Sequence, residues 1–255
     1  MKRIMMICTL GVTSSYIYNN VTKEFPIDEV VVVGKGSRKV FLKRRIKRLG
    51  LPKVMGQIIF SLYSKIFLKK EADARIQTIQ KMYGLDDADI PEDRITHIAS
   101  VNSEEMKNRI REMNPDLILI NGTPIIKGEI LSVTDAKFVN IHVGITPKYR
   151  GVHGGYWALY NNDAELAGVT THFVDEGIDS GEVLDQKVIE VTEDDNFLTY
   201  SHLQEAYALV DYNKIIGSIL DDTFKVKEPL TRESALWSHP TIFSYLYGRT
   251  IKKVK

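Results

Sequence analysis

Apolar and polar residues alternate along this chain as short apolar runs separated by longer amphipathic stretches. Runs rich in isoleucine, leucine and valine predict buried strands at 3–10, 28–33, 95–98, 117–120, 137–142, 168–174 and 182–191. Stretches with helical spacing predict helices near 14–23, 69–84, 102–113, 127–131 and 195–220. Strands that alternate with helices are typical of an α/β fold with a doubly wound, mostly parallel sheet and helices on both of its faces.

Cap residues and composition shifts divide the chain further. Asn102 and Glu105 form a capping box that would open one helix, and Asp194 or Asn196 would cap the long helix that follows. We assign residues 1–220 to one catalytic domain that carries a helical insertion at about 35–84. Residues 221–255 form a small C-terminal appendage, which we expect to pack on the sheet domain or on a second subunit.

The insertion opens with a cluster of basic residues: Lys35, Arg38, Lys39, Lys43, Arg44, Arg45, Lys47 and Arg48. An apolar, aromatic segment follows at 54–68. Three interpretations stay open: a solvated basic helix before a buried one, a phosphate-binding surface for a nucleotide-linked substrate, or peripheral attachment to an anionic membrane.

The bulk composition excludes several classes of protein. A formal net charge of +1 over 255 residues provides no global field for nucleic acid. The single cysteine, Cys8, excludes an internal disulfide, and its apolar surroundings predict a buried thiol. The apolar runs are too short for a signal peptide or for the ~20 residues of a membrane span. The histidines lack metal-ligand spacing, so we expect no metal site and a cytoplasmic protein.

The candidate chemistry lies at the end of the strand at 137–142. Asn140 and His142 are two residues apart, so their side chains point to the same side of that strand. An amide donor beside an imidazole suits a reaction in which a carbonyl oxygen gains negative charge while a proton moves. Asp179, between Gly177 and Gly181, lies on a loop that could bring its carboxylate to the pair. Taken singly, each is also an ordinary turn or loop residue.

Several motifs agree together in order and spacing. Asn140-x-His142 is followed by Pro147 and Gly151, then by the segments 168–174 and 177–181. This arrangement, over about 116–190, resembles the folate-dependent formyltransferase family, whose fold is Rossmann-like. One departure is Gly144, which stands where the family's usual His-Pro-Ser loop has its serine, so contacts of that serine cannot be carried over.

The resemblance implies transfer of a formyl group from N10-formyltetrahydrofolate to a primary amine. Asn140 would donate an N–H to the formyl oxygen, His142 would support it, and Asp179 would hold His142 and help to move the surplus proton of the amine. The folate would lie along Thr123, Pro124, Ile125 and Ile126, and along Val174, Gly177 and Ile178. The acceptor would contact Gly144, Lys148, Tyr149, Arg150 and His153. His172 is interpreted as a hydrogen-bonded core residue.

The insertion and the variant loop resemble family members that formylate nucleotide-linked amino-sugars for surface polysaccharides such as lipopolysaccharide. The tRNA-formylating branch of the family carries a second, β-barrel domain. We rank it below the sugar-formylating members, because the 65 or so residues after Glu190 do not have the pattern of such a domain. The alternatives are a formyltetrahydrofolate hydrolase, a phosphoribosylglycinamide-type formyltransferase and a non-catalytic membrane-associated scaffold. We expect a small-molecule amine as partner, no nucleic acid, and a homodimer.

Overall fold

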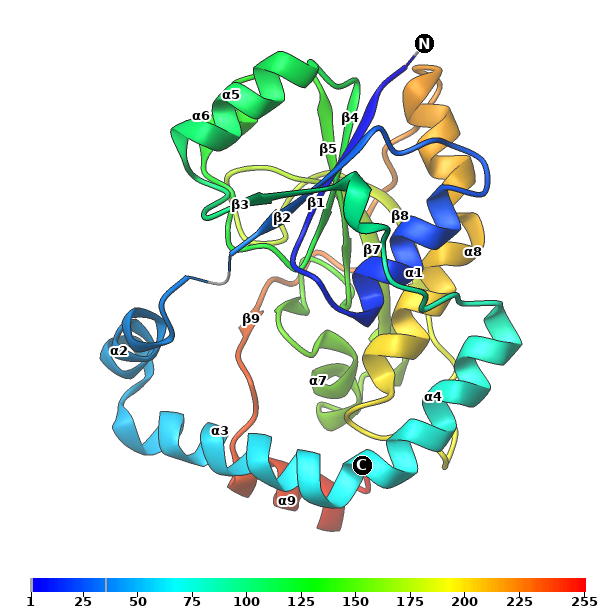
Figure 1. Cartoon of the computed structure of the whole chain (residues 1–255). Helices are drawn as coiled ribbons and strands as arrows, with labels where there is room; N and C mark the ends of the chain where they lie inside the picture. Colours follow the sequence, from blue (N-terminus) through cyan, green and yellow to red (C-terminus); the bar gives the residue numbers. More distant parts are fainter. Residues whose placement is uncertain (1, 35) are drawn as a thin grey trace.

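The computed structural model describes residues 2–34 and 36–255. Met1 lies outside the described residues, and so does Lys35, which the sequence placed in the basic cluster. A seven-stranded sheet in the order β3-β2-β1-β4-β5-β7-β8 forms the centre of the molecule (Figure 1). Its strands are β1 (Ile4–Cys8), β2 (Glu29–Val33), β3 (Ile95–Ile98), β4 (Leu117–Asn121), β5 (Lys137–His142), β7 (Gly168–Phe173) and β8 (Val183–Val188). The first five in spatial order run parallel, β7 is antiparallel to β5, and β8 is antiparallel to β7. The predicted doubly wound, mostly parallel sheet is confirmed.

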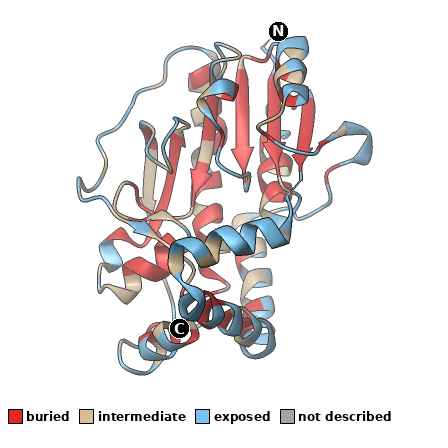
Figure 2. Ribbon diagram, turned by 90° about the vertical axis from the view of Figure 1, so that its left-hand side faces the viewer, coloured by how far each residue is buried: buried red, intermediate tan, exposed pale blue. Residues whose placement is uncertain are grey.

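Helices cover both faces of the sheet. They are α1 (Val12–Val21), α5 (Glu104–Met113), α6 (Gly128–Leu131), α7 (Gly154–Tyr160) and α8 (Tyr200–Leu220), with short 3-10 turns η2 (Glu92–Arg94) and η3 (Ala164–Leu166). Successive strand residues point to opposite faces, so Met6 and Leu119 pack toward α1 and α8, whereas Met5 and Ile118 pack toward α5 and α6. The central strands are therefore apolar throughout and buried on both sides (Figure 2). Cys8 is fully buried, as predicted.

Two predicted helix starts are wrong, for local hydrogen-bonding reasons. Ser103, not Asn102, caps α5 and accepts a bond from Met106 N, while the Asn102 amide bonds to the loop at 125–127 instead. Helix α8 begins at Tyr200, later than predicted. Asp195 accepts bonds from Thr192 and from Arg75, which holds the residues before Tyr200 in a separate turn.

The insertion forms helices beyond the carboxyl ends of the strands. They are α2 (Arg38–Leu49), α3 (Leu51–Tyr63), a π-helical turn η1 (Ser64–Leu68) and α4 (Lys69–Tyr83). The C-terminal segment adds β9 (Leu236–Trp237), which pairs with β6 (Arg150–Gly151), and α9 (Ile242–Thr250), which packs beside α3 (Figure 1). The Phe60 ring of α3 stacks on Tyr245 of α9, with 4.5 Å between centroids. Within the described residues, no helix is long and apolar enough to cross a bilayer.

Candidate active site

The predicted trio meets beside the end of β5. Asn140 and His142 share a face of the sheet with Phe138, the face that α5 and α6 cover. His142 is buried, and its Nδ1 lies 3.4 Å from Asp179 Oδ2. Its Nε2 lies 2.8 Å from the carbonyl oxygen of Tyr149, which can only accept. Both ring nitrogens thus face acceptor atoms, which fix the orientation of the imidazole ring.

Asp179 is held by backbone geometry as well as by charge. Its φ of +49° lies in the left-handed region, which Asp and Asn tolerate better than most residues. The same Oδ2 atom accepts a hydrogen bond of 2.9 Å from Gly151 N, so the loops at 144–151 and 174–182 are tied together. The Asp179 side chain keeps about a fifth of its surface exposed, so water and a reacting amine can reach its carboxylate.

The Asn140 amide is oriented by His172, which the sequence analysis interpreted as a hydrogen-bonded core residue. His172 faces Asn140 across the antiparallel β5–β7 pair. His172 Nδ1 donates to the carbonyl of Phe173 at 2.7 Å, and burial, followed by the nearness of His142, lowers the pKa of His172. The neutral ring therefore presents Nε2 as an acceptor to Asn140 Nδ2 at 3.3 Å. His172 fixes which way the amide points, and only the strand register could have indicated this.

The departure at Gly144 has a steric consequence. A Cβ atom at this position would overlap the carbonyl oxygen of Tyr149 and would lie 2.8 Å from His142 Nε2. The absent side chain allows the backbone of the loop to fold against the imidazole. Glycine at 144 is therefore part of how this chain positions His142.

The predicted acceptor residues are engaged within the protein to different degrees. Tyr149 is fully buried with its hydroxyl bonded to Asp163, and Lys148 pairs with Asp163 at 2.8 Å. His153 packs against His239, its Nε2 2.8 Å from His239 Nδ1, and burial lowers the pKa of His153 to about 3. Arg150 donates to the carbonyl of Ile178 at 3.3 Å, beside Asp179. Arg150 thus contacts the Asp179 loop directly.

The two loops predicted to hold the folate are neighbours. Ile126 is buried in the same core cluster against which Val174 packs, and the Glu176 side chain lies directly against Gly128. Ile125 is 58% exposed. An exposed aliphatic side chain beside loop backbone suits a flat bicyclic ring with amide-like edges, because it offers apolar contact and hydrogen-bonding groups together. These residues fit a folate between the loops and Asn140.

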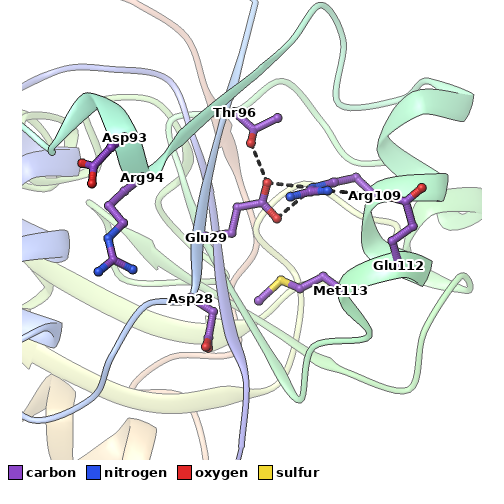
Figure 3. A pocket seen from close by; sticks show the side chains of 8 residues that line it. All are labelled: Asp28, Glu29, Asp93, Arg94, Thr96, Arg109, Glu112 and Met113. Atoms are coloured by element: carbon purple, nitrogen blue, oxygen red, sulfur yellow. Dashed lines mark hydrogen bonds and ion pairs between the residues drawn. The ribbon is translucent and has the colours of Figure 1, made fainter.

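An open pocket lies at the opposite, amino-terminal edge of the sheet. Some of its side chains form a network, in which Glu29 accepts from Thr96 Oγ1 at 2.6 Å and from Arg109 Nε at 2.7 Å (Figure 3). This network joins β2, β3 and α5, which is a structural role. No group of three His, Cys, Asp or Glu side chains in 2–34 and 36–255 could hold a metal ion.

Comparison with known proteins places the chain in a family. A sequence profile described as formyl transferase matches residues 63–218. A methionyl-tRNA formyltransferase of Thermodesulfovibrio yellowstonii is 35% identical over 122 residues, which are 46% of this chain and 38% of that protein. A GDP-perosamine N-formyltransferase of Brucella melitensis is 32% identical over 119 residues, 46% of each chain. The matches thus span less than half the length of these curated relatives.

Solved structures share the fold at low sequence identity. A sugar N-formyltransferase from Shewanella sp. has a TM-score of 0.57 at 17% identity, covering 92% of this chain and 76% of that one. A phosphoribosylglycinamide formyltransferase from Streptococcus pneumoniae has a TM-score of 0.54 at 20% identity, covering 86% and 99%. Because the profile matches more than half of its residues, this chain belongs to the formyl transferase family.

Proposed function

We propose that this protein transfers a formyl group from N10-formyltetrahydrofolate to a primary amine at the Asn140, His142 and Asp179 site. The observation that carries the proposal is the convergence of these three side chains, with His142 Nδ1 3.4 Å from Asp179 Oδ2, in a chain of the formyl transferase family. When bound, the folate donor supplies the formyl carbon, and its bond from that carbon to N10 is exchanged for a bond to the amine nitrogen.

Each residue has a distinct part in that exchange. His172 holds one N–H of the Asn140 amide, which leaves the second N–H to donate to the formyl oxygen as it gains negative charge. His142 supports that oxygen from its place two residues along the strand, and Tyr149 and Asp179 hold its ring. Asp179 accepts the proton that the attacking amine loses, directly or through a water, and N10 gains a proton as the leaving nitrogen.

The acceptor we propose is the amino group of a nucleotide-linked amino-sugar. One relative is named for GDP-perosamine, and a structural neighbour from Helicobacter canadensis, with a TM-score of 0.53, 19% identity and coverage of 93% of this chain and 71% of that one, was solved with folinic acid and dTDP-3-aminofucose. The Arg150 guanidinium beside the Asp179 loop supports this acceptor, since it suits an anionic or hydroxyl-rich partner. Sugar formylation would place the protein in surface polysaccharide synthesis in the cytoplasm.

A panel of acceptors tests this proposal. The purified protein is incubated with N10-formyltetrahydrofolate and, separately, nucleotide-linked amino-sugars, glycinamide ribonucleotide, methionyl-tRNA or no acceptor, and the formylated product and tetrahydrofolate are quantified. We expect one equivalent of formylated sugar per tetrahydrofolate formed. Turnover of glycinamide ribonucleotide or methionyl-tRNA without sugar turnover would contradict the acceptor, and formate release without any acceptor would identify a hydrolase.

A further inference from the structure

The helices of the insertion carry an apolar face that no part of the described chain covers. We define the outer helix face as Leu51, Met55, Ile58, Leu62 and Ile66, all exposed, with Leu62 at 57% and Ile66 at 69%. These residues are four, three, four and four positions apart, so they form one stripe along α3 and η1. The opposite side of the same helix, with Val54 and Phe60, is buried. The helix is therefore apolar both toward the protein and away from it.

All charged residues in α2, α3 and η1 are basic. Residues 30–70 contain twelve of the 34 Lys and Arg residues and none of the 33 Asp and Glu residues. Helix α2, which precedes the stripe, has no buried residue among those whose exposure is described (Figure 2). A strongly basic segment thus adjoins an exposed aliphatic stripe that runs from Leu51 to Ile66, about 24 Å along the helix at 1.5 Å per residue.

We propose that α2 and the outer helix face dock this protein on an anionic membrane surface. Basic side chains gain from the negative potential of anionic lipid headgroups, and an exposed aliphatic stripe gains from burial at the boundary of headgroups and acyl chains. Two helices in contact, α2 and α3, supply both terms. Because one side of this helix is packed on the protein, the helix would lie in the plane of the interface with its exposed side toward the lipid. No helix within the described residues is long and apolar enough to cross a bilayer.

Three other occupants fit these features less well. A second copy packed symmetrically on this face would bring two acid-free segments together, and like charges oppose that contact. A nucleic acid would match the basic residues through its phosphates, but it would leave Leu62 and Ile66 without apolar partners. The diphosphate of a single nucleotide needs a few cations and no aliphatic stripe. Charge and exposure together favour lipid.

Vesicle sedimentation with the full chain tests the proposal. We expect it to sediment with vesicles of phosphatidylglycerol and phosphatidylcholine, to remain in solution with phosphatidylcholine alone, and to be released by high salt. The double variant Leu62→Ser and Ile66→Ser should lower the bound fraction about tenfold, since it removes two aliphatic side chains that would enter the membrane. The matched control is Met82→Ser with Val210→Ser, two apolar residues exposed to 64% and 63% on α4 and α8, and it should bind like wild type.

A charge pair completes the test. Lys43→Glu with Arg44→Glu should abolish binding to anionic vesicles, whereas Lys23→Glu with Lys81→Glu should not. Vesicle binding that is unchanged in the Leu62 and Ile66 variant, or an equal affinity for neutral vesicles, would overturn the proposal. So would a concentration-dependent dimer that the Leu62 and Ile66 variant dissolves, or tRNA binding that replaces vesicle binding. Circular dichroism and formyl transfer in vesicle-free solution should match wild type in every variant, which separates this proposal from that of the active site.

Discussion

The loops beside β5 and the helices of the insertion differ in how completely their side chains are satisfied within the protein. Around His142 nearly every polar atom has a partner inside the protein: a carbonyl for one nitrogen, a carboxylate for the other, and a neighbouring histidine for Asn140. Around α3 one side is packed and the other exposes a row of aliphatic side chains. We propose that the first region positions reacting atoms and that the second contacts a partner outside the chain. Variants in the two regions should therefore fail in different assays.

The largest effect on stability is expected where the insertion is anchored. Phe60→Ala removes a fully buried ring that stacks on Tyr245 and meets Phe197 edge-on at 4.7 Å. We expect the free energy of unfolding to fall by about 4 kcal/mol, measured by urea denaturation. Phe243→Ala, at a ring 78% exposed, is the control and should change it by less than about 0.5 kcal/mol. Equal losses in the two variants would mean that α3 is not anchored by its inner face.

The largest effect on chemistry is expected at Asn140. Asn140→Ala removes the donor to the developing oxyanion, so the rate of formyl transfer should fall about 10²–10³-fold while the thermal midpoint stays near wild type. Asn108→Ala, on the exposed side of α5, should leave the rate unchanged. A rate within a few-fold of wild type for Asn140→Ala would show that the amide does not contact the reacting oxygen.

Asp179→Asn separates charge from geometry. Asparagine tolerates the left-handed backbone and can still accept from Gly151 N, so the loop should keep its shape. The negative charge facing His142 is lost, and we expect the transfer rate to fall about 100-fold with an altered pH profile. An unchanged pH profile with a reduced rate would indicate that Asp179 is needed only for loop structure.

The last effect expected is a pH dependence of stability at the anchor of the insertion. Burial lowers the pKa of His239 to about 4 from 6.5, so the unfolded chain binds a proton that the folded chain does not. This contribution to stability is fully present above the unfolded pKa and is lost as the pH falls from 6.5 toward 4, at up to about 1.4 kcal/mol per pH unit. His239→Gln should unfold with a weaker pH dependence over that window than wild type. Parallel curves of unfolding free energy against pH for wild type and His239→Gln would contradict this role of His239.

The sequence predicted the strands, the sheet and the meeting of Asn140, His142 and Asp179, because apolar runs and motif spacing carry that information along the chain. It did not predict the roles of His172 and of the Tyr149 carbonyl. His172 acts through an antiparallel pairing with Asn140, and the carbonyl reaches His142 because Gly144 has no side chain. The late start of α8 likewise depends on Asp195 bonding Arg75, which is 120 residues away in the chain. Contacts between distant segments decide what local patterns leave open.

One measurement tests the central claim most directly. Wild-type protein in excess is mixed with N10-formyltetrahydrofolate that carries a ¹³C-labelled formyl group and with a nucleotide-linked amino-sugar, and the label is followed by NMR through a single turnover. The account predicts that the label moves from the folate to an amide on the sugar, and that Asn140→Ala slows this transfer. Label that remains on the folate, leaves as formate, or transfers at an undiminished rate in Asn140→Ala would contradict it.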